Sequence, residues 1–288
     1  MKNTLIVLAF IFAGCATKPP APEPTGSSMQ VETERPTEPG QFEPYAKRTK
    51  LPGVMDVPGV EVLKHTCYTV YYDTNYKLAR HVTYRLKRED LATRTGKRKE
   101  NFKIDPMLRE RNLPYYSLAA YRKSKVDSPY APGHLAPAAD FARSQKAMDE
   151  SFYLSNMVPQ EDAMNSPTWV ELEDQVRFWA CGEKDVTVIT GGYLKPGLKT
   201  LSTGVPIPPQ MFKVVIDETA PRKMIGFVYN QSDRGEVMRE RVVSVAKIEA
   251  AAGYSLKNDV EGFEKLKDSG ISEWKSEDCL PKAKRKSK

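Results

Sequence analysis

Short runs rich in β-branched and aromatic residues recur along this chain, and each has the length of a strand. The runs cover residues 67–72, 81–86, 186–190, 211–216 and 224–229. Residues of this kind favour extended backbone and the half-buried surface of a sheet. The pattern therefore predicts five strands that pair in a central antiparallel sheet.

A different periodicity predicts one long helix over residues 166–180. Four apolar residues recur there at intervals of three or four positions and form one stripe: Trp169, Leu172, Val176 and Trp179. Asn165 or Ser166 is expected to cap the helix, and Pro167 suits its first turn. Glu173 and Arg177 are four residues apart, so both should project from a neighbouring face.

Two shorter helices are expected near the C-terminus, over residues 244–252, closed by Gly253, and over residues 260–266. Strands followed by helices without regular alternation indicate the α+β class. We see no internal repeat, and we expect one folded domain over residues 61–280.

The N-terminus has the pattern of an export signal. Lys2 precedes an apolar run over residues 5–12, followed by Ala13-Gly14-Cys15. The run is too short for a membrane span, and small residues precede the expected cut. The sequence predicts a lipoprotein signal over residues 1–14 and lipidation of Cys15; a plain signal peptide is the alternative, because Phe12 stands where such signals usually have leucine.

Both flanks of the domain have the composition of flexible chain. Residues 15–60 are dense in proline, glutamate, threonine and serine, and they predict a tether between the lipid and the domain. Residues 281–288 predict a disordered basic tail. Five of the charges behind the net +7 lie in the last seven residues, so net charge is weak evidence for a nucleic-acid partner.

Cys67, Cys181 and Cys279 would remain in the exported domain. An exported protein meets conditions that permit disulfides, so we expect one pair and one free thiol. The sequence does not say which two pair. No two of the three have the spacing of metal ligands, which argues against a cysteine-based zinc centre.

The chain has three histidines, and His134 has the most distinctive context. We expect structural or surface roles for His65 and His81. His134 follows Pro132-Gly133, and small residues follow it. This pattern predicts a sharp turn that another element can approach closely.

Two motifs lie downstream of Gly133-His134-Leu135-Ala136-Pro137. Residues 155–160 read Ser-Asn-Met-Val-Pro-Gln, and Asn-x-x-x-Trp-x-x-x-Glu-x-x-x-Arg begins at Asn165. Together, in this order and spacing, they resemble the core of the DNA/RNA non-specific endonuclease family, which includes endonuclease G. The resemblance covers residues 63–280 and implies the ββα-metal (His-Me finger) nuclease fold, with a central antiparallel sheet and flanking helices.

The resemblance also implies a role for each motif residue. His134 would be the general base, and Asn165 the single direct protein ligand of a Mg²⁺ ion, for which Mn²⁺ should substitute. Glu173 would hold an ion-bound water, although a solvent-facing carboxylate paired with Arg177 is the alternative. Arg177 would meet phosphate. Asn156 would position His134 or the substrate, or would simply form a turn.

The chain departs from the family pattern at Ala131-Pro132, where Asp-Arg usually precedes Gly-His. The missing arginine normally faces the scissile phosphate, and Arg143, Arg122 or Lys125 are candidates to replace its charge.

Hydrolysis of DNA and RNA through backbone contacts is therefore the first functional hypothesis. A catalytically weakened nucleic-acid-binding envelope lipoprotein of the same fold is the second, and a structural envelope protein with a basic tail is the third. All three place the protein in a bacterial cell envelope, lipid-anchored, periplasmic or at the outer membrane.

Overall fold

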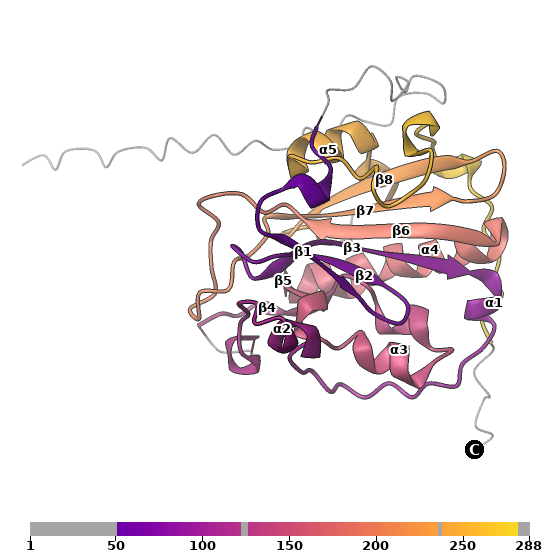
Figure 1. Ribbon diagram of the computed structural model, residues 1–288. Helices are drawn as coiled ribbons and strands as arrows, with labels where there is room; N and C mark the ends of the chain where they lie inside the picture. The colour runs from indigo at the N-terminus through magenta and orange to yellow at the C-terminus, as the bar shows by residue number, and fades with distance from the viewer. Residues whose placement is uncertain (1–50, 122–125, 236–237, 282–288) are drawn as a thin grey trace, which may run out of the picture. The chain divides into compact units, whose positions relative to one another are not determined.

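The computed structural model describes residues 51–121, 126–235 and 238–281. Seven strands form one sheet in the order β1-β2-β3-β6-β7-β8-β9, and each neighbouring pair is antiparallel (Figure 1). Their bounds are β1 Val60–Lys64, β2 Thr69–Asp73, β3 Leu78–Lys87, β6 Asp185–Gly192, β7 Gln210–Asp217, β8 Lys223–Asn230 and β9 Val242–Val243. The five strands expected from the sequence are confirmed as β2, β3, β6, β7 and β8.

A separate antiparallel pair consists of β4 (Tyr130–His134) and β5 (Met157–Glu161). Neither strand was predicted. Pro132 and Pro159 face each other across this pair, and proline lacks the N–H that a continuous ladder needs. The sharp turn expected at Gly133 is wrong, because Gly133 lies inside β4. Its requirement for glycine is steric: a Cβ there would lie 1.8 Å from Oε1 of Gln160.

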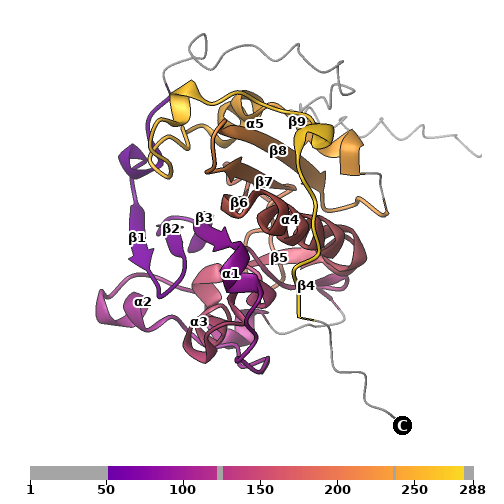
Figure 2. The same cartoon turned by 90° about the vertical axis from the view of Figure 1, so that its right-hand side faces the viewer.

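The long helix is confirmed as α4 (Val170–Glu183), which lies against the sheet (Figure 2). An irregular helical turn, Met164–Trp169, leads into it. All four residues of the predicted apolar stripe are buried. The expected cap is wrong: no side chain caps α4, and Ser166 has extended backbone angles (φ −151°, ψ 124°).

The remaining helices are short. They are α1 Arg88–Leu91, α2 Pro106–Glu110, α3 Gln145–Glu150 and α5 Val245–Ala252. The prediction for α5 is confirmed, since Ser244 caps it and Gly253 ends it in the left-handed region (φ 78°). The helix expected over residues 260–266 is reduced to a 3₁₀ turn at Phe263–Lys265.

The folded unit begins before Glu61, the expected boundary. Val54 is fully buried, and Ser255 N donates to the carbonyl of Pro52 at 2.7 Å. Residues 51–60 therefore pack with the domain and are not part of a tether. The signal, the lipidation site Cys15, the rest of the tether and residues 282–288 lie outside the described residues. Among the described helices, none combines the length and apolar character that a membrane span requires.

One disulfide joins Cys181, in the last turn of α4, to Cys279, and Cys67 is a free thiol. The expectation of one pair and one free cysteine is thus confirmed. The C-terminal segment also follows α4 through hydrogen bonds, with Glu277 N donating to the Phe178 carbonyl at 3.1 Å. Covalent and backbone contacts together fix this segment along the helix.

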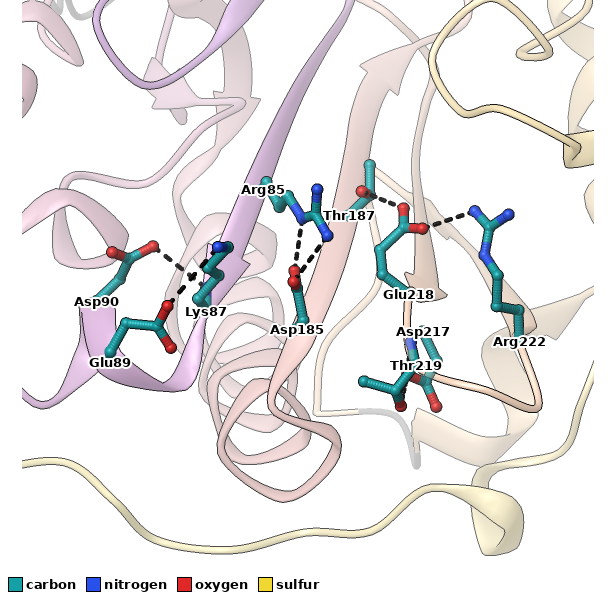
Figure 3. Close-up of polar contacts among 10 residues, drawn as sticks. All are labelled: Arg85, Lys87, Glu89, Asp90, Asp185, Thr187, Asp217, Glu218, Thr219 and Arg222. Carbon is teal, nitrogen blue, oxygen red and sulfur yellow. Dashed lines mark hydrogen bonds and ion pairs between the residues drawn. The ribbon is translucent and has the colours of Figure 1, made fainter.

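Polar pairs link β3, β6 and the β7–β8 turn (Figure 3). Arg85 on β3 donates twice to Asp185 on β6, at 2.7 Å each. Glu218 accepts from Thr187 and from Arg222, at 2.6 Å each. Arg85 is more than half exposed, so its pair contributes little to stability, on the order of 0–1 kcal/mol. The first pair joins two interior strands of the sheet, and the second set closes the β7–β8 turn.

Candidate active site

The predicted site residues lie on two strands followed by a helix. His134 ends β4 and pairs in register with Met157, the first residue of β5. Asn165 lies between β5 and α4, and Glu173 and Arg177 lie on α4. The chain therefore has the order strand, strand, helix that the sequence resemblance implied.

His134 is half-buried against aromatic rings. Its ring meets Phe152 edge to face, with centroids 4.8 Å apart, and Phe102 lies at 6.0 Å. Nε2 is buried and has no hydrogen-bond partner among the described residues. Burial, and secondly the charge of Arg98, lowers the pKa of His134 to about 3. The imidazole is therefore neutral across the physiological range, as a proton acceptor must be.

Asn156 fixes the chain that follows His134. Its Oδ1 accepts from Ala136 N at 2.9 Å, and its Nδ2 donates to the carbonyls of Ala136 (2.9 Å) and Ser151 (2.8 Å). The side chain is fully buried. Of the roles weighed from the sequence, this geometry fits positioning of the His134 segment, because a buried amide cannot reach a substrate.

Asn165 is half-buried, and its side chain makes no hydrogen bond with any described residue. An amide oxygen without a partner fits a hard cation such as Mg²⁺, which prefers oxygen and retains most of its water. Within residues 51–121, 126–235 and 238–281, no group of three or more His, Cys, Asp or Glu side chains could hold a metal. The unpartnered amide of Asn165 fits a single direct contact with such an ion.

Glu173 lies in a partly desolvated place on α4. Burial raises the pKa of Glu173 to about 7, while Lys213 and Arg177 oppose that rise. Its carboxylate accepts no hydrogen bond from the residues that the structure describes. The surface ion pair with Arg177, the alternative considered from the sequence, is not the arrangement found.

Arg177 is buried and already paired. It donates to Asp140 at 2.7 Å and to Asp174 at 2.6 Å. Asp140 also accepts from the hydroxyl of Tyr84 at 2.7 Å. Asp140 follows His134 by six residues, so this pair ties α4 to the His134 segment. The structure gives Arg177 a linking contact, and its predicted contact with phosphate is not tested.

Arg98, which was not among the cations suggested from the sequence, lies close enough to His134 to act on its charge. Its guanidinium lies over the Phe152 ring, 5.4 Å from the centroid, and this ring also contacts His134. Arg143, by contrast, pairs with Asp90 at 3.0 Å. Arg122 and Lys125 lie outside the described residues. No sequence motif marked Arg98, because it is brought to the site from a loop far from Gly-His.

Gln160 shows what the Ala131-Pro132 departure does locally. It is fully buried and faces Ala131 across the β4–β5 pair. Neither its Oε1 nor its Nε2 has a partner among the described residues. Alanine offers this amide no polar group, whereas the carboxylate that usually stands in the family could do so.

A cavity of about 1070 Å³ lies elsewhere, along β2, β3 and β6. Its lining includes Thr69, Thr83, Arg85, Thr187 and Arg222, and none of the predicted site residues. A polymer grips an open surface through its backbone, so a cavity is not required at the His134 site. His65 and His81 are paired with Asp105 and Asp259, each at 3.0 Å, as expected for structural histidines.

Comparison with known proteins places the chain in a family. The model of the family described as DNA/RNA non-specific endonuclease matches residues 53–263. A nuclease from Syncephalastrum racemosum is 32% identical over 220 residues, 68% of this chain and 67% of that protein. Mitochondrial nuclease EXOG from Danio rerio is 30% identical over 212 residues, 68% of this chain and 60% of that protein.

Human mitochondrial endonuclease G is 33% identical over 178 residues, 57% of each chain. The chain thus spans about three fifths of the length of these relatives. Among solved structures, a chain of the EndoG/EndoGI complex has the same fold, with a TM-score of 0.60, 24% identity and coverage of 76% of this chain and 97% of that one. The protein belongs to the DNA/RNA non-specific endonuclease family and has its α+β ββα-metal fold.

Proposed function

We propose that this protein is a Mg²⁺-dependent endonuclease that hydrolyses the phosphodiester bonds of DNA and RNA without sequence preference. The observation that carries the proposal is the state of His134, a neutral imidazole with no competing partner at the end of the first strand of a ββα unit. Family membership supports the same reaction. The animal and fungal relatives are named as nucleases.

His134 would accept the proton of the attacking water. Nε2 is buried, so we assign the Nδ1 edge of the ring as the acceptor. Asn156 would hold the segment in place, and the Arg177–Asp140 pair would keep α4 fixed relative to it. Arg98 would supply positive charge near the phosphate, because it shares the Phe152 ring with His134.

Asn165 would hold the divalent ion through its amide oxygen, and Glu173 would accept hydrogen bonds from water at the same place. The ion, when bound, supplies positive charge for the phosphate and for the leaving 3′ oxygen. Glu173 can accept these hydrogen bonds from water only when its carboxylate is ionised. Because its pKa is about 7, this ionisation occurs near neutral pH.

Cutting of plasmid DNA and of RNA by residues 51–288 tests the proposal. We expect cutting with Mg²⁺ or Mn²⁺ and none with excess EDTA. Asn165→Ala should raise the Mg²⁺ concentration needed for half-maximal cutting by about tenfold or more, because it removes the only direct protein ligand we assign. Absence of cutting by the wild-type protein at every divalent ion tested would refute the proposal.

The second candidate function is binding of nucleic acid without hydrolysis. The observations that favour it are Ala131-Pro132, which leaves Gln160 unpartnered, and Arg177, which is already paired with two aspartates. Salt-sensitive DNA binding that is indifferent to EDTA, together with no turnover, would support this candidate over the enzyme.

The charge near His134 gives a prediction with a matched control. Arg98→Ala should lower kcat/KM by about 10- to 100-fold, since one charge-assisted contact to the transition state is lost. Arg143→Ala removes the same group from a site paired with Asp90 and should change kcat/KM less than threefold. Steady-state cutting of a short fluorescent duplex measures both. The opposite order of effects would assign the compensating charge to Arg143.

We further propose export and lipidation at Cys15, as the sequence pattern indicates. The Cys181–Cys279 disulfide supports this, because such bonds persist in oxidising compartments. Confinement outside the cytoplasm would also protect the cell's own genome from an unspecific nuclease. Membrane fractionation of cells that express the full chain or its Cys15→Ala variant tests the anchor, and equal membrane association of both would refute it.

A further inference from the structure

Lys213 is a buried cation that no motif identified. It lies on β7, and its side chain is 1% exposed. Its Nζ donates to Oγ1 of Thr190 on the paired strand β6, at 2.8 Å. An ammonium has three donors, and Thr190 is the only hydrogen-bond acceptor for it among the described residues. Burial of a charge with so little compensation is costly, so an anion nearby is needed.

The position of Lys213 points to Glu173 as that anion. Its Nζ lies 4.8 Å from the centroid of the Trp169 ring, at the start of α4. Trp169 and Glu173 are four residues apart, so their side chains lie on one face of the helix, one turn from each other. Helix α4 packs against β6, the strand that carries Thr190 and pairs with β7 (Figure 2). Lys213 thus lies beneath the helix face that bears Glu173.

The other charged groups around Glu173 leave Lys213 as its principal counter-ion. Arg177 and Asp174 come from α4 itself, and Asp140 comes from the segment after His134. Arg177 is engaged by both aspartates, at 2.7 and 2.6 Å. Its charge is therefore largely balanced before Glu173 is considered. No carboxylate of the described residues, Glu173 included, lies within ion-pairing distance of Lys213, so Lys213 and Glu173 act on each other through space and not through a direct contact.

We infer that Lys213 is a positioning residue that acts through Glu173: it lies beneath the helix face that bears Glu173 and favours the ionised carboxylate, the form that would accept from water at Asn165. The catalytic consequence of this inference rests on the proposed function. The electrostatic interaction between Lys213 and Glu173 does not depend on it. Burial lowers the pKa of Lys213 to about 8, while Glu173 acts to raise it. Each group thus favours the charged form of the other, and loss of Lys213 leaves Glu173 protonated at neutral pH.

Lys213→Met tests this through the pH dependence of cutting. Glu173 must be ionised, so the kcat/KM of the wild-type protein should rise with pH through about 7. Without Lys213 this rise should move to higher pH by about one to two units, as expected when an opposite charge is removed from a carboxylate. At pH 7 the variant should therefore cut about 10-fold or more slowly, and part of the loss should return at pH 9.

Lys223→Met is the matched control. Lys223 lies on β8, with its Nζ 5.1 Å from the Trp274 ring, and it pairs with Glu183 at 2.9 Å. This substitution removes the same charge from a similar aromatic contact away from Glu173. We expect it to lower stability and to leave the pH profile unchanged. An equal shift in both variants would overturn the assignment.

Two further measurements separate this inference from the proposed function. Carboxyl ¹³C NMR of the metal-free protein follows Glu173 directly, with Glu173→Gln identifying its signal. The titration midpoint should rise in Lys213→Met, whether or not the wild-type protein cuts nucleic acid. An unchanged midpoint would overturn the inference.

The double variant Glu173→Gln/Lys213→Met covers the case in which the single variant does not fold. It removes both charges, so it should fold, and its rate should match that of Glu173→Gln alone. If the double variant also fails to fold, or if the two rate losses multiply, Lys213 has a structural role and the inference falls.

Discussion

His134→Ala should reduce kcat for plasmid cutting by about 10²- to 10⁴-fold, the range expected when a general base is removed. The wild-type imidazole is neutral because burial lowers its pKa to about 3, so it is available as a base throughout pH 5–9. A substrate phosphate beside the ring would raise this pKa, which would strengthen the base when the polymer is bound. Undiminished cutting by His134→Ala would refute the assignment.

The pH dependence distinguishes His134 from Glu173. A base is lost when it is protonated, and for His134 in the free protein this happens only as pH falls toward 3. Glu173 is protonated below about 7, so it should set the acid side of the kcat/KM profile. Glu173→Gln should therefore flatten the profile between pH 5 and 8 as well as lower the rate. An acid limb that persists in Glu173→Gln would contradict this division of roles.

Imidazole in solution provides a control for folding. The ring of His134 packs on Phe152 and Phe102, so its removal leaves a small space at a half-exposed position. We expect the circular dichroism spectrum of His134→Ala to match that of the wild type and added imidazole to restore part of the cutting. A variant that is inactive because it is unfolded would show neither property.

The strands of the main sheet were predictable because their hydrophobic pattern agrees with their burial. β7 and β8 are apolar almost throughout, and their predicted bounds differ from the observed ones by a single residue at each end. β4 was not predictable from pattern, because Pro132 and Gly133 argue against a strand. It forms because Val158 and Pro159 of β5 oppose these two residues, and that pairing is long-range.

The site residues were identified by motif, but their contacts were not predictable. Arg177 was expected at phosphate because the motif resembles that of the endonuclease family. Its partner Asp140 lies 37 residues earlier and became visible only in three dimensions. Lys213 and Arg98 have no local signature at all, since a lysine within a strand and an arginine within a loop are common in any sequence. Long-range packing brings these two residues to the site, and no short motif encodes that packing.

The departure from the family pattern at Ala131-Pro132 has a local cost, which is seen at Gln160. A buried amide without partners costs about 1–3 kcal/mol per unsatisfied group. The chain tolerates this cost next to the His134 strand while it retains Asn156 in full hydrogen bonding. The framework that aims His134 is therefore intact, and what the departure removes is charge. The charge of Arg98, near the same ring, is the feature that can compensate.

Removal of the disulfide should have the largest effect on stability. Cys181 and Cys279 are 98 residues apart, and in the chain-entropy model a loop of that size contributes about 4–5 kcal/mol. Cys181→Ala/Cys279→Ala should therefore lower the melting temperature by roughly 10–20 °C, given about 2–4 °C per kcal/mol for a domain of this size. Thermal unfolding followed by circular dichroism measures it, and reducing agent should have the same effect on the wild type.

Cys67→Ala is the matched control for that experiment. Cys67 is a half-buried free thiol whose contact is Arg143 at 3.3 Å, so its loss should change the melting temperature by only a few degrees. The disulfide fixes the C-terminal segment along α4, the helix that bears Glu173 and Arg177. Its loss should therefore reduce cutting at temperatures well below the new melting point, as the segment detaches. Equal melting temperatures for the double variant and Cys67→Ala would show that backbone contacts alone hold the segment.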